Sequence, residues 1–152
     1  MLLAAADYEH AVLVVIEDSA YAELVSVLDR NLPEASGFPA WINPGVFVMG
    51  RLMYGISAWE VRPVVAAEKL KQRGIPLFIL HGGADETVAP SHAEMLHEAN
   101  SEAAFWLAPG VGHVELYLHP EYAERLNVFL DGIESAGASE PEGVRASSLW
   151  EN

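Results

Sequence analysis

The chain has 152 residues, 51% of them apolar and 20% charged, which is the composition of one soluble globular domain. Its net charge of −14 disfavours nucleic-acid binding, because so acidic a surface repels phosphate and no cluster of basic residues offsets it. The absence of cysteine excludes disulfides, thiol catalysis and cysteine-bound metals.

The first residues predict the end of a helix followed by a buried strand. Met1–Ala6 consists of strong helix formers. Its short apolar run has no basic segment before it, so it resembles neither a signal peptide nor a membrane span, and we expect a cytoplasmic protein. Ala11–Ile16 is an unbroken apolar run, typical of a strand that helices cover on both faces of a parallel sheet.

A helix and a long apolar connection follow. Ala20–Leu28 has helical spacing of its apolar residues, which Asn31 and Pro33 then interrupt. Residues 31–62 are rich in Pro, Gly and large apolar side chains, and we interpret them as a cap-like insert. A segment of this kind often forms one wall of a binding cleft, although its aromatic residues could equally cover core surface. The candidate substrate-binding residues are therefore Trp41, Met53 and Trp59.

The second half of the chain alternates helices with short apolar runs. Pro63 suits the first position of a helix that Gly74 ends, and Ser91 with Glu94 forms a capping box for the next helix. Such alternation predicts an α/β fold with a parallel sheet flanked by helices. We place a partial domain at residues 1–135 and a disordered tail at 136–152. The expected elements are helix Val64–Arg73, strand Ile75–Leu80, helix Ser91–Asn100, strand Ala103–Leu107 and a helix that begins at Pro120.

Ionisable side chains follow all three predicted strands. Asp18, Asp85 and His113 each lie just beyond an apolar run, and glycines flank the last two. Ligands of parallel sheets bind at the carboxyl ends of the strands, where neighbouring loops meet. A carboxylate that orients an imidazole is two-thirds of a catalytic triad, so Asp85 is the predicted acid and His113 the predicted base. Asp18 is an alternative acid, or it anchors the following helix.

These residues lie in a pattern that resembles the C-terminal half of the α/β-hydrolase superfamily. The matching residues are Ile75-Pro76, His81-Gly82, Asp85, Val88 and Pro109-Gly110-Val111-Gly112-His113. The Asp18-Ser19-x-Tyr21 segment and the helix with Pro120, Tyr122 and Phe129-Leu130 are similar as well. The resemblance covers roughly residues 1–133 and implies strands six to eight of that fold. It also implies that Asp85 is the acid of the triad and His113 its base.

The nucleophile of that superfamily has no counterpart here. Its serine lies in a G-x-S-x-G turn after the fifth strand, and no serine of this chain has that context. The nearest match, Gly55-Ile56-Ser57-Ala58-Trp59, lacks the final glycine. The oxyanion-hole donors belong to the N-terminal half, which has no match here either. We therefore expect that the chain begins shortly after the nucleophile and is inactive alone.

Three functions remain open from the sequence. The first is the C-terminal part of a serine hydrolase acting on an ester or amide carbonyl, with no cofactor. The second is a non-catalytic module that associates with itself or a partner through an open sheet edge. The third is a truncated fragment without a function of its own. The sequence indicates neither the substrate nor the oligomeric state.

Other polar residues receive less specific interpretations. We expect His81 to pack a loop beside the site and Glu115 to be solvated. His92 and His97 have a spacing that does not favour a shared face of their helix. A metal site built from His81, Asp85 and His113 is disfavoured, because no familiar ligand spacing is present.

Overall fold

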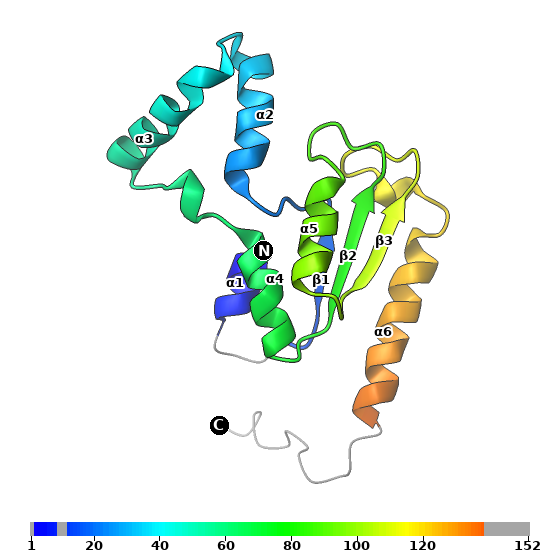
Figure 1. The fold of residues 1–152 in the computed structure, drawn as a ribbon. Helices are drawn as coiled ribbons and strands as arrows, with labels where there is room; N and C mark the ends of the chain where they lie inside the picture. Colours follow the sequence, from blue (N-terminus) through cyan, green and yellow to red (C-terminus); the bar gives the residue numbers. More distant parts are fainter. Residues whose placement is uncertain (1, 9–11, 139–152) are drawn as a thin grey trace, which may run out of the picture. The chain divides into compact units, whose positions relative to one another are not determined.

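The computed structural model describes residues 2–8 and 12–138. They form two compact units that divide at Pro120. None of the described helices is long and apolar enough to span a membrane. Three 3-10 turns, η1 (Ala40–Ile42), η2 (Ala58–Glu60) and η3 (Leu116–Leu118), join the main elements. In chain order these elements are α1 (Leu2–Asp7), β1 (Val15–Asp18), α2 (Leu24–Ser36), α3 (Asn43–Tyr54), α4 (Pro63–Gln72), β2 (Leu77–Gly82), α5 (Ser91–Ala99), β3 (Ala104–Ala108) and α6 (Tyr122–Ala138) (Figure 1).

The three strands form one parallel sheet in the order β1-β2-β3. Every residue of β2 is buried, because it pairs on both sides and carries an apolar sequence. The register pairs Asp18 with Leu80, and Leu80 with Trp106. The predicted α/β class is thereby confirmed. The numbering of the strands as six to eight stays a prediction.

Helices α1, α4 and α5 cover one face of the sheet (Figure 1). Small residues on α4, such as Ala66 and Ala67, let the helices approach closely, while Leu70 and Leu96 fill the space between them. Full burial of a leucine contributes about 1.5–3 kcal/mol, so these contacts fix the helices on the sheet. The buried cluster is Leu2, Ala6, Val15, Ala22, Ala66, Ala67, Leu70, Leu77, Ile79, Ala93, Leu96 and Ala103.

The first strand differs from its prediction. It covers Val15–Asp18 rather than Ala11–Ile16, and Val15 is its one buried residue. Ala11 itself lies outside the described residues. Because β1 is at the edge of the sheet, its side chains are only partly covered, whereas the apolar run predicts a strand buried on both faces.

Helix α2 continues through a proline that the sequence interpretation treats as its end. Pro33 has no N–H and cannot donate to the carbonyl of Asp29 four residues earlier. The side chain of Asn43 substitutes for that donor, since its Nδ2 lies 3.4 Å from Asp29 O and 3.0 Å from Asp29 Oδ1. The helix therefore extends to Ser36 and ends at Gly37, whose φ is +72°.

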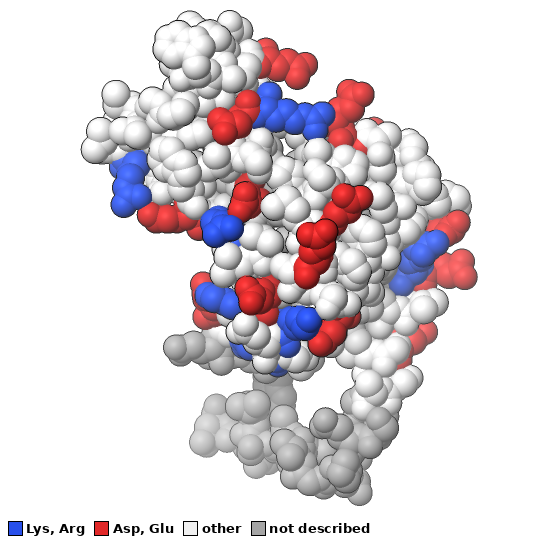
Figure 2. Space-filling model, in the orientation of Figure 1, with Lys and Arg blue, Asp and Glu red and all other residues white. Residues whose placement is uncertain are grey.

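Residues 31–62 are mostly helical. Figure 1 shows α2 and α3 as a two-helix projection at the end of the sheet toward which the strands point. No residue of α2 is buried, and only Asn43 and Phe47 of α3 are. The aromatic and aliphatic side chains of this segment are thus largely exposed instead of covering a core. The surface over α3 is mostly uncharged (Figure 2). The interpretation as a cap-like insert stays a prediction.

The later helices follow their predictions except at the start of α5 and the end of α6. Helix α4 ends before Gly74, whose φ of +65° permits the turn into β2. The predicted capping box of Ser91 and Glu94 is wrong, because Ser91 is the first helical residue and no side chain caps the N-terminus. Helix α6 continues to Ala138, past the predicted start of the tail at 136. The remainder of that tail, 139–152, lies outside the described residues.

Candidate active site

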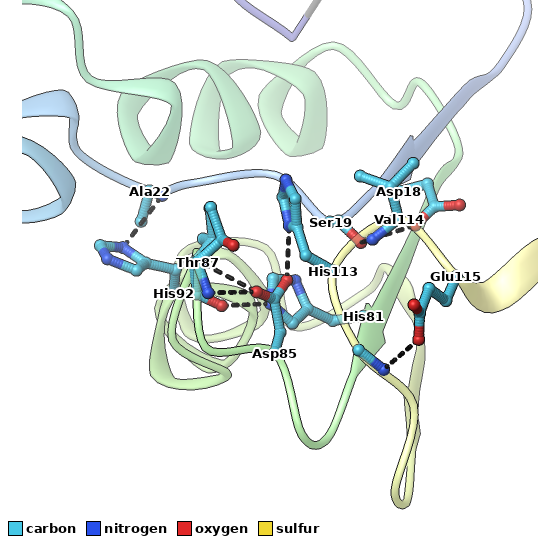
Figure 3. Close-up of polar contacts among 12 residues, drawn as sticks. Asp18, Ser19, Ala22, His81, Asp85, Thr87, His92, His113, Val114 and Glu115 are labelled. Carbon is cyan, nitrogen blue, oxygen red and sulfur yellow. Dashed lines mark hydrogen bonds and ion pairs between the residues drawn. The ribbon is translucent and has the colours of Figure 1, made fainter. Parts of the chain in front are cut away.

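The acid of the predicted pair is buried and held on both oxygens. Asp85 lies in the loop after β2 and is 3% exposed. Its Oδ1 accepts hydrogen bonds from the backbone N–H groups of Thr87, at 2.9 Å, and Val88, at 2.8 Å. Its Oδ2 lies 2.8 Å from Nδ1 of His113 (Figure 3). A loop that satisfies one oxygen and aims the other at an imidazole fixes the carboxylate in place.

The base of the pair lies in the loop after the neighbouring strand β3. The side chain of His113 is 34% exposed, so its ring reaches solvent while its Nδ1 faces Asp85. If Nδ1–H donates to Asp85, Nε2 keeps a lone pair that can accept a proton. The structure therefore brings His113 and Asp85 together in the arrangement that general-base chemistry requires.

Two glycines allow the two loops to meet. A Cβ on Gly82 would lie 2.4 Å from the carbonyl oxygen of Val111, and one on Gly83 would lie 3.0 Å from that of Ala108. The backbone N–H of Gly83 donates to Ala108 O at 2.7 Å, and that of Ala84 donates to Val111 O at 2.9 Å. The loop that carries His113 is thus held against the end of β2.

His81 lies next to the acid, at a position within β2 from which it packs the loop beside the site, as expected. It is fully buried, and its Nε2 lies 2.9 Å from the carbonyl oxygen of Val88 and 3.3 Å from Oδ2 of Asp85. Its Nδ1 has no hydrogen-bond partner among the residues that the structure describes. The ring therefore donates from Nε2 and supports the loop that holds Asp85.

Asp18 ends β1, and Ser19 follows it beside the same loops. No hydrogen bond joins Asp18 to His113 within the described residues; its Oδ1 accepts from Ser19 Oγ at 2.9 Å. Since α2 begins only at Leu24, Asp18 does not anchor that helix, and this part of the prediction is wrong. Ser19 Oγ also lies 3.2 Å from the backbone nitrogen of Val114, directly after His113. The sequence pattern includes Ser19 in the matching segment after the first strand but assigns it no role; its position directly after a candidate acid is the available signal.

A cavity of about 320 Å³ opens beside His113. Its wall combines the first turn of α1 with the end of β1 and the loops of the site. Burial raises the pKa of Glu17 in this wall above its ordinary value, and the charge of Asp18 adds to the rise. The lining residues are Leu2, Leu3, Glu17, Asp18, Ser19, Ala20, Tyr21, Pro63, Val88, His113 and Val114.

The three candidate substrate-binding residues lie elsewhere. Trp41 is 79% exposed, Met53 64% and Trp59 43%, and none of them lines the cavity at His113. Trp59 packs edge-on against Phe47 of α3, with ring centroids 5.4 Å apart. The structure does not bring these side chains to the acid–base pair, although it does not bury them beneath the sheet either.

The remaining polar candidates have structural partners. His92 Nδ1 accepts from the backbone N–H of Ala22 at 3.3 Å, and His97 stacks on Phe105. Glu115 is exposed, and its Oε2 accepts from Gly112 N at 3.3 Å. Within the part of the chain that the structure describes, no group of three or more His, Asp or Glu residues could hold a metal ion.

Comparison with known proteins relates both sequence and fold to hydrolases. No family model matches the chain. It is 33% identical over 82 residues to the alpha/beta hydrolase domain-containing protein aho-3 of Caenorhabditis elegans, a match that covers 53% of this chain and 24% of that protein. Among solved structures, the Pyrococcus furiosus esterase Pf2001 superposes with a TM-score of 0.57 at 20% identity. A puromycin-hydrolyzing peptidase of Mycobacterium tuberculosis gives a TM-score of 0.52 at 19% identity.

The share of each protein that matches is unequal. The esterase comparison covers 86% of this chain and 48% of the esterase, and the peptidase comparison covers 95% and 21%. The chain thus spans about half of the esterase and about a quarter or less of the other two.

Proposed function

We propose that this chain, which has the α/β-hydrolase fold and is related in sequence to that superfamily, supplies the acid and base of a serine-type hydrolase. The observation that carries the proposal is the 2.8 Å contact between Asp85 Oδ2 and His113 Nδ1. Both residues lie at the carboxyl ends of adjacent parallel strands, where such folds bind ligands. The substrate class is an ester or amide carbonyl.

In this mechanism His113 Nε2 takes the proton of a serine hydroxyl as the serine oxygen bonds to the carbonyl carbon. Asp85 keeps the proton on Nδ1 and stabilises the imidazolium that forms. His113 then returns the proton to the leaving alcohol or amine. Attack by water, activated in the same way, releases the acyl group and restores the serine.

We assign the nucleophile to none of the serines in this chain, because none lies in a G-x-S-x-G turn. The cavity beside His113 indicates where a serine from outside this sequence could lie. Leu2 and Leu3 of α1 line that cavity, so a serine near the first turn of this helix would face His113. We therefore propose that the chain alone is inactive. Trp41, Met53 and Trp59 stay predictions as substrate contacts.

The test supplies the missing nucleophile. The chain is joined to a segment of an α/β-hydrolase that carries a G-x-S-x-G turn, and hydrolysis of p-nitrophenyl esters is measured. We expect activity that His113→Ala lowers by about 10⁶ and Asp85→Ala by about 10⁴, as in other complete triads. His97→Ala serves as the control, since His97 stacks on Phe105 and is bonded to neither Asp85 nor His113 within the described residues. Activity that survives His113→Ala would contradict the proposal, as would fluorophosphonate labelling of a serine in the chain alone.

A second candidate function rests on the open edge of the sheet. Strand β1 pairs with β2 on one side and with no other strand among the described residues. Such an edge can accept a strand from a partner or from a second copy. Size-exclusion chromatography over a range of concentrations tests this association. A monomer at the highest concentration would argue against pairing between copies.

A further inference from the structure

Two residues beside the acid–base pair have an unusual backbone conformation. Among the described residues, Ser19 and Val114 are the two that have positive φ without being glycine, at 57° and 55°. For a β-branched residue such as Val114 this conformation is a clear outlier. Strained conformations persist only where the surrounding structure holds them. These two residues hold one another, because Val114 N lies 3.2 Å from Ser19 Oγ (Figure 3).

The direction of this hydrogen bond is determined by the neighbours of Ser19. Its hydroxyl has one proton, which it donates to Asp18 Oδ1 at 2.9 Å. The same oxygen therefore accepts from the N–H of Val114. The Ser19 side chain has little freedom to move, since the residue is 6% exposed and its own N–H donates to Leu80 O at 2.9 Å.

The bond from Val114 to Ser19 holds the loop that carries His113 on its β1 side, opposite the bonds that hold it on its β2 side. On the β2 side, the loop is held by the bonds from Gly83 to Ala108 and from Ala84 to Val111, which end before His113. On the β1 side, the bond to Ser19 holds the residue directly after His113. Val114 is 49% exposed, so its own packing does not account for its positive φ.

We infer that Ser19 is a positioning residue for His113. Its hydroxyl, oriented by Asp18, holds the N–H of Val114 so that His113 Nδ1 meets Asp85. Asp18 thereby acts on the imidazole through Ser19 and not as a direct partner. The catalytic role of the bond between Val114 N and Ser19 Oγ rests on the proposed function, whereas the bond itself can be tested without an activity assay.

The experiment uses the full ¹⁵N-labelled chain and two variants. Ser19→Ala removes the hydroxyl and keeps the strain at position 19, while Ser19→Gly removes the hydroxyl and relieves that strain. In both, we expect hydrogen exchange of the Val114 amide to become about 5- to 10-fold faster, because its acceptor is lost. We also expect the NMR signal of the His113 Nδ1 proton to broaden or disappear. Ser26→Ala, which removes an exposed hydroxyl bonded to the carbonyl oxygen of Glu23 just before α2, should change neither.

The two variants separate the possible results. If Ser19→Gly leaves both Val114 exchange and the His113 signal as in the parent chain, the inference is overturned. If Ser19→Ala fails to fold, Ser19→Gly and Asp18→Ala still decide the matter. In the nucleophile-bearing enzyme, Ser19→Gly should lower kcat about 10-fold or more with KM unchanged. If the Ser19 variants lose both the slow Val114 exchange and the His113 signal, but His113→Ala leaves the activity unchanged, the proposed function is wrong and the contact between Ser19 and Val114 still stands.

Discussion

Replacing Gly82 with alanine should separate the acid from the base without touching either. A Cβ at this position would lie 2.4 Å from Val111 O and 2.5 Å from Gly112 O. Ordinary contact begins at 3.4 Å, so the loop would have to retreat by 3.4 − 2.4, or about 1.0 Å. Neither oxygen can turn away easily, because both belong to backbone, and Val111 O accepts from Ala84 N.

The displacement carries His113 with it, since His113 follows Gly112 directly. A shift of about 1 Å would lengthen its 2.8 Å contact with Asp85 beyond hydrogen-bonding range. Overpacking costs about 1–3 kcal/mol. The lost bond to a charged group adds about 1.5–3 kcal/mol. We therefore expect the free energy of unfolding to fall by about 2–5 kcal/mol. This is less than the sum of the two terms, because both arise from the same displacement and overlap in part.

Urea unfolding and the NMR signal of the His113 Nδ1 proton measure the two effects. The matched control is Gly50→Ala in the interior of α3, where a Cβ would meet nothing within 4 Å. That change should stabilise the protein by up to about 1 kcal/mol, because alanine favours helix more than glycine. A Gly82→Ala variant that unfolds at the parent's urea concentration and keeps the His113 signal would refute the reasoning.

Three further predictions concern other parts of the molecule. Asn43→Ala should lower the urea midpoint by an amount equivalent to about 1–3 kcal/mol, because Asp29 O loses the side-chain donor that replaces the missing N–H of Pro33. An unchanged midpoint would contradict this role. The control Asn31→Ala, which breaks an exposed bond to Thr87 O, should cost less. Glu17→Gln should raise stability at pH 7 and have little effect below about pH 4.5. Burial raises the pKa of Glu17, so the folded chain loses stability as the pH rises above about 4.5 and the carboxyl ionises. Equal gains at pH 4 and pH 7 would show that the carboxyl is not the cause. Lowering the pH from 7.5 to 5.5 should weaken folding through His92, because burial lowers its pKa and protonation removes the acceptor for Ala22 N; His92→Gln should reduce this dependence, measured as the difference in urea midpoint between the two pH values.

The acid–base pair could be predicted because its signals are local. Asp85 and His113 each follow an apolar run and a glycine-bearing turn, and parallel strands bring such turns to the same edge. The contacts that surround the pair are not local. The Ser19 hydroxyl meets a backbone N–H 95 residues later, and no spacing rule predicts that contact.

The same distinction explains the errors in the fold. Pro33 is a valid stop signal for an isolated helix, but Asn43 supplies the lost donor from outside α2. The apolar sequence of Ala11–Ile16 indicates a strand without indicating whether it lies at the centre or the edge of a sheet. Ser91 and Glu94 have the spacing of a capping box, yet the helix begins at Ser91 itself, one residue too early for Ser91 to be its cap.

The exposed projection of α2 and α3 also determines how unfolding can be observed. Trp41 lies in η1 between α2 and α3, and Trp59 lies in η2 and packs on Phe47 of α3. Trp106 is instead buried in β3, and Trp150 lies outside the described residues. A region with so few buried side chains opens at a lower free-energy cost than the sheet. Intrinsic fluorescence will therefore blend a local opening with the global transition. A single tryptophan at position 106 would follow the sheet alone.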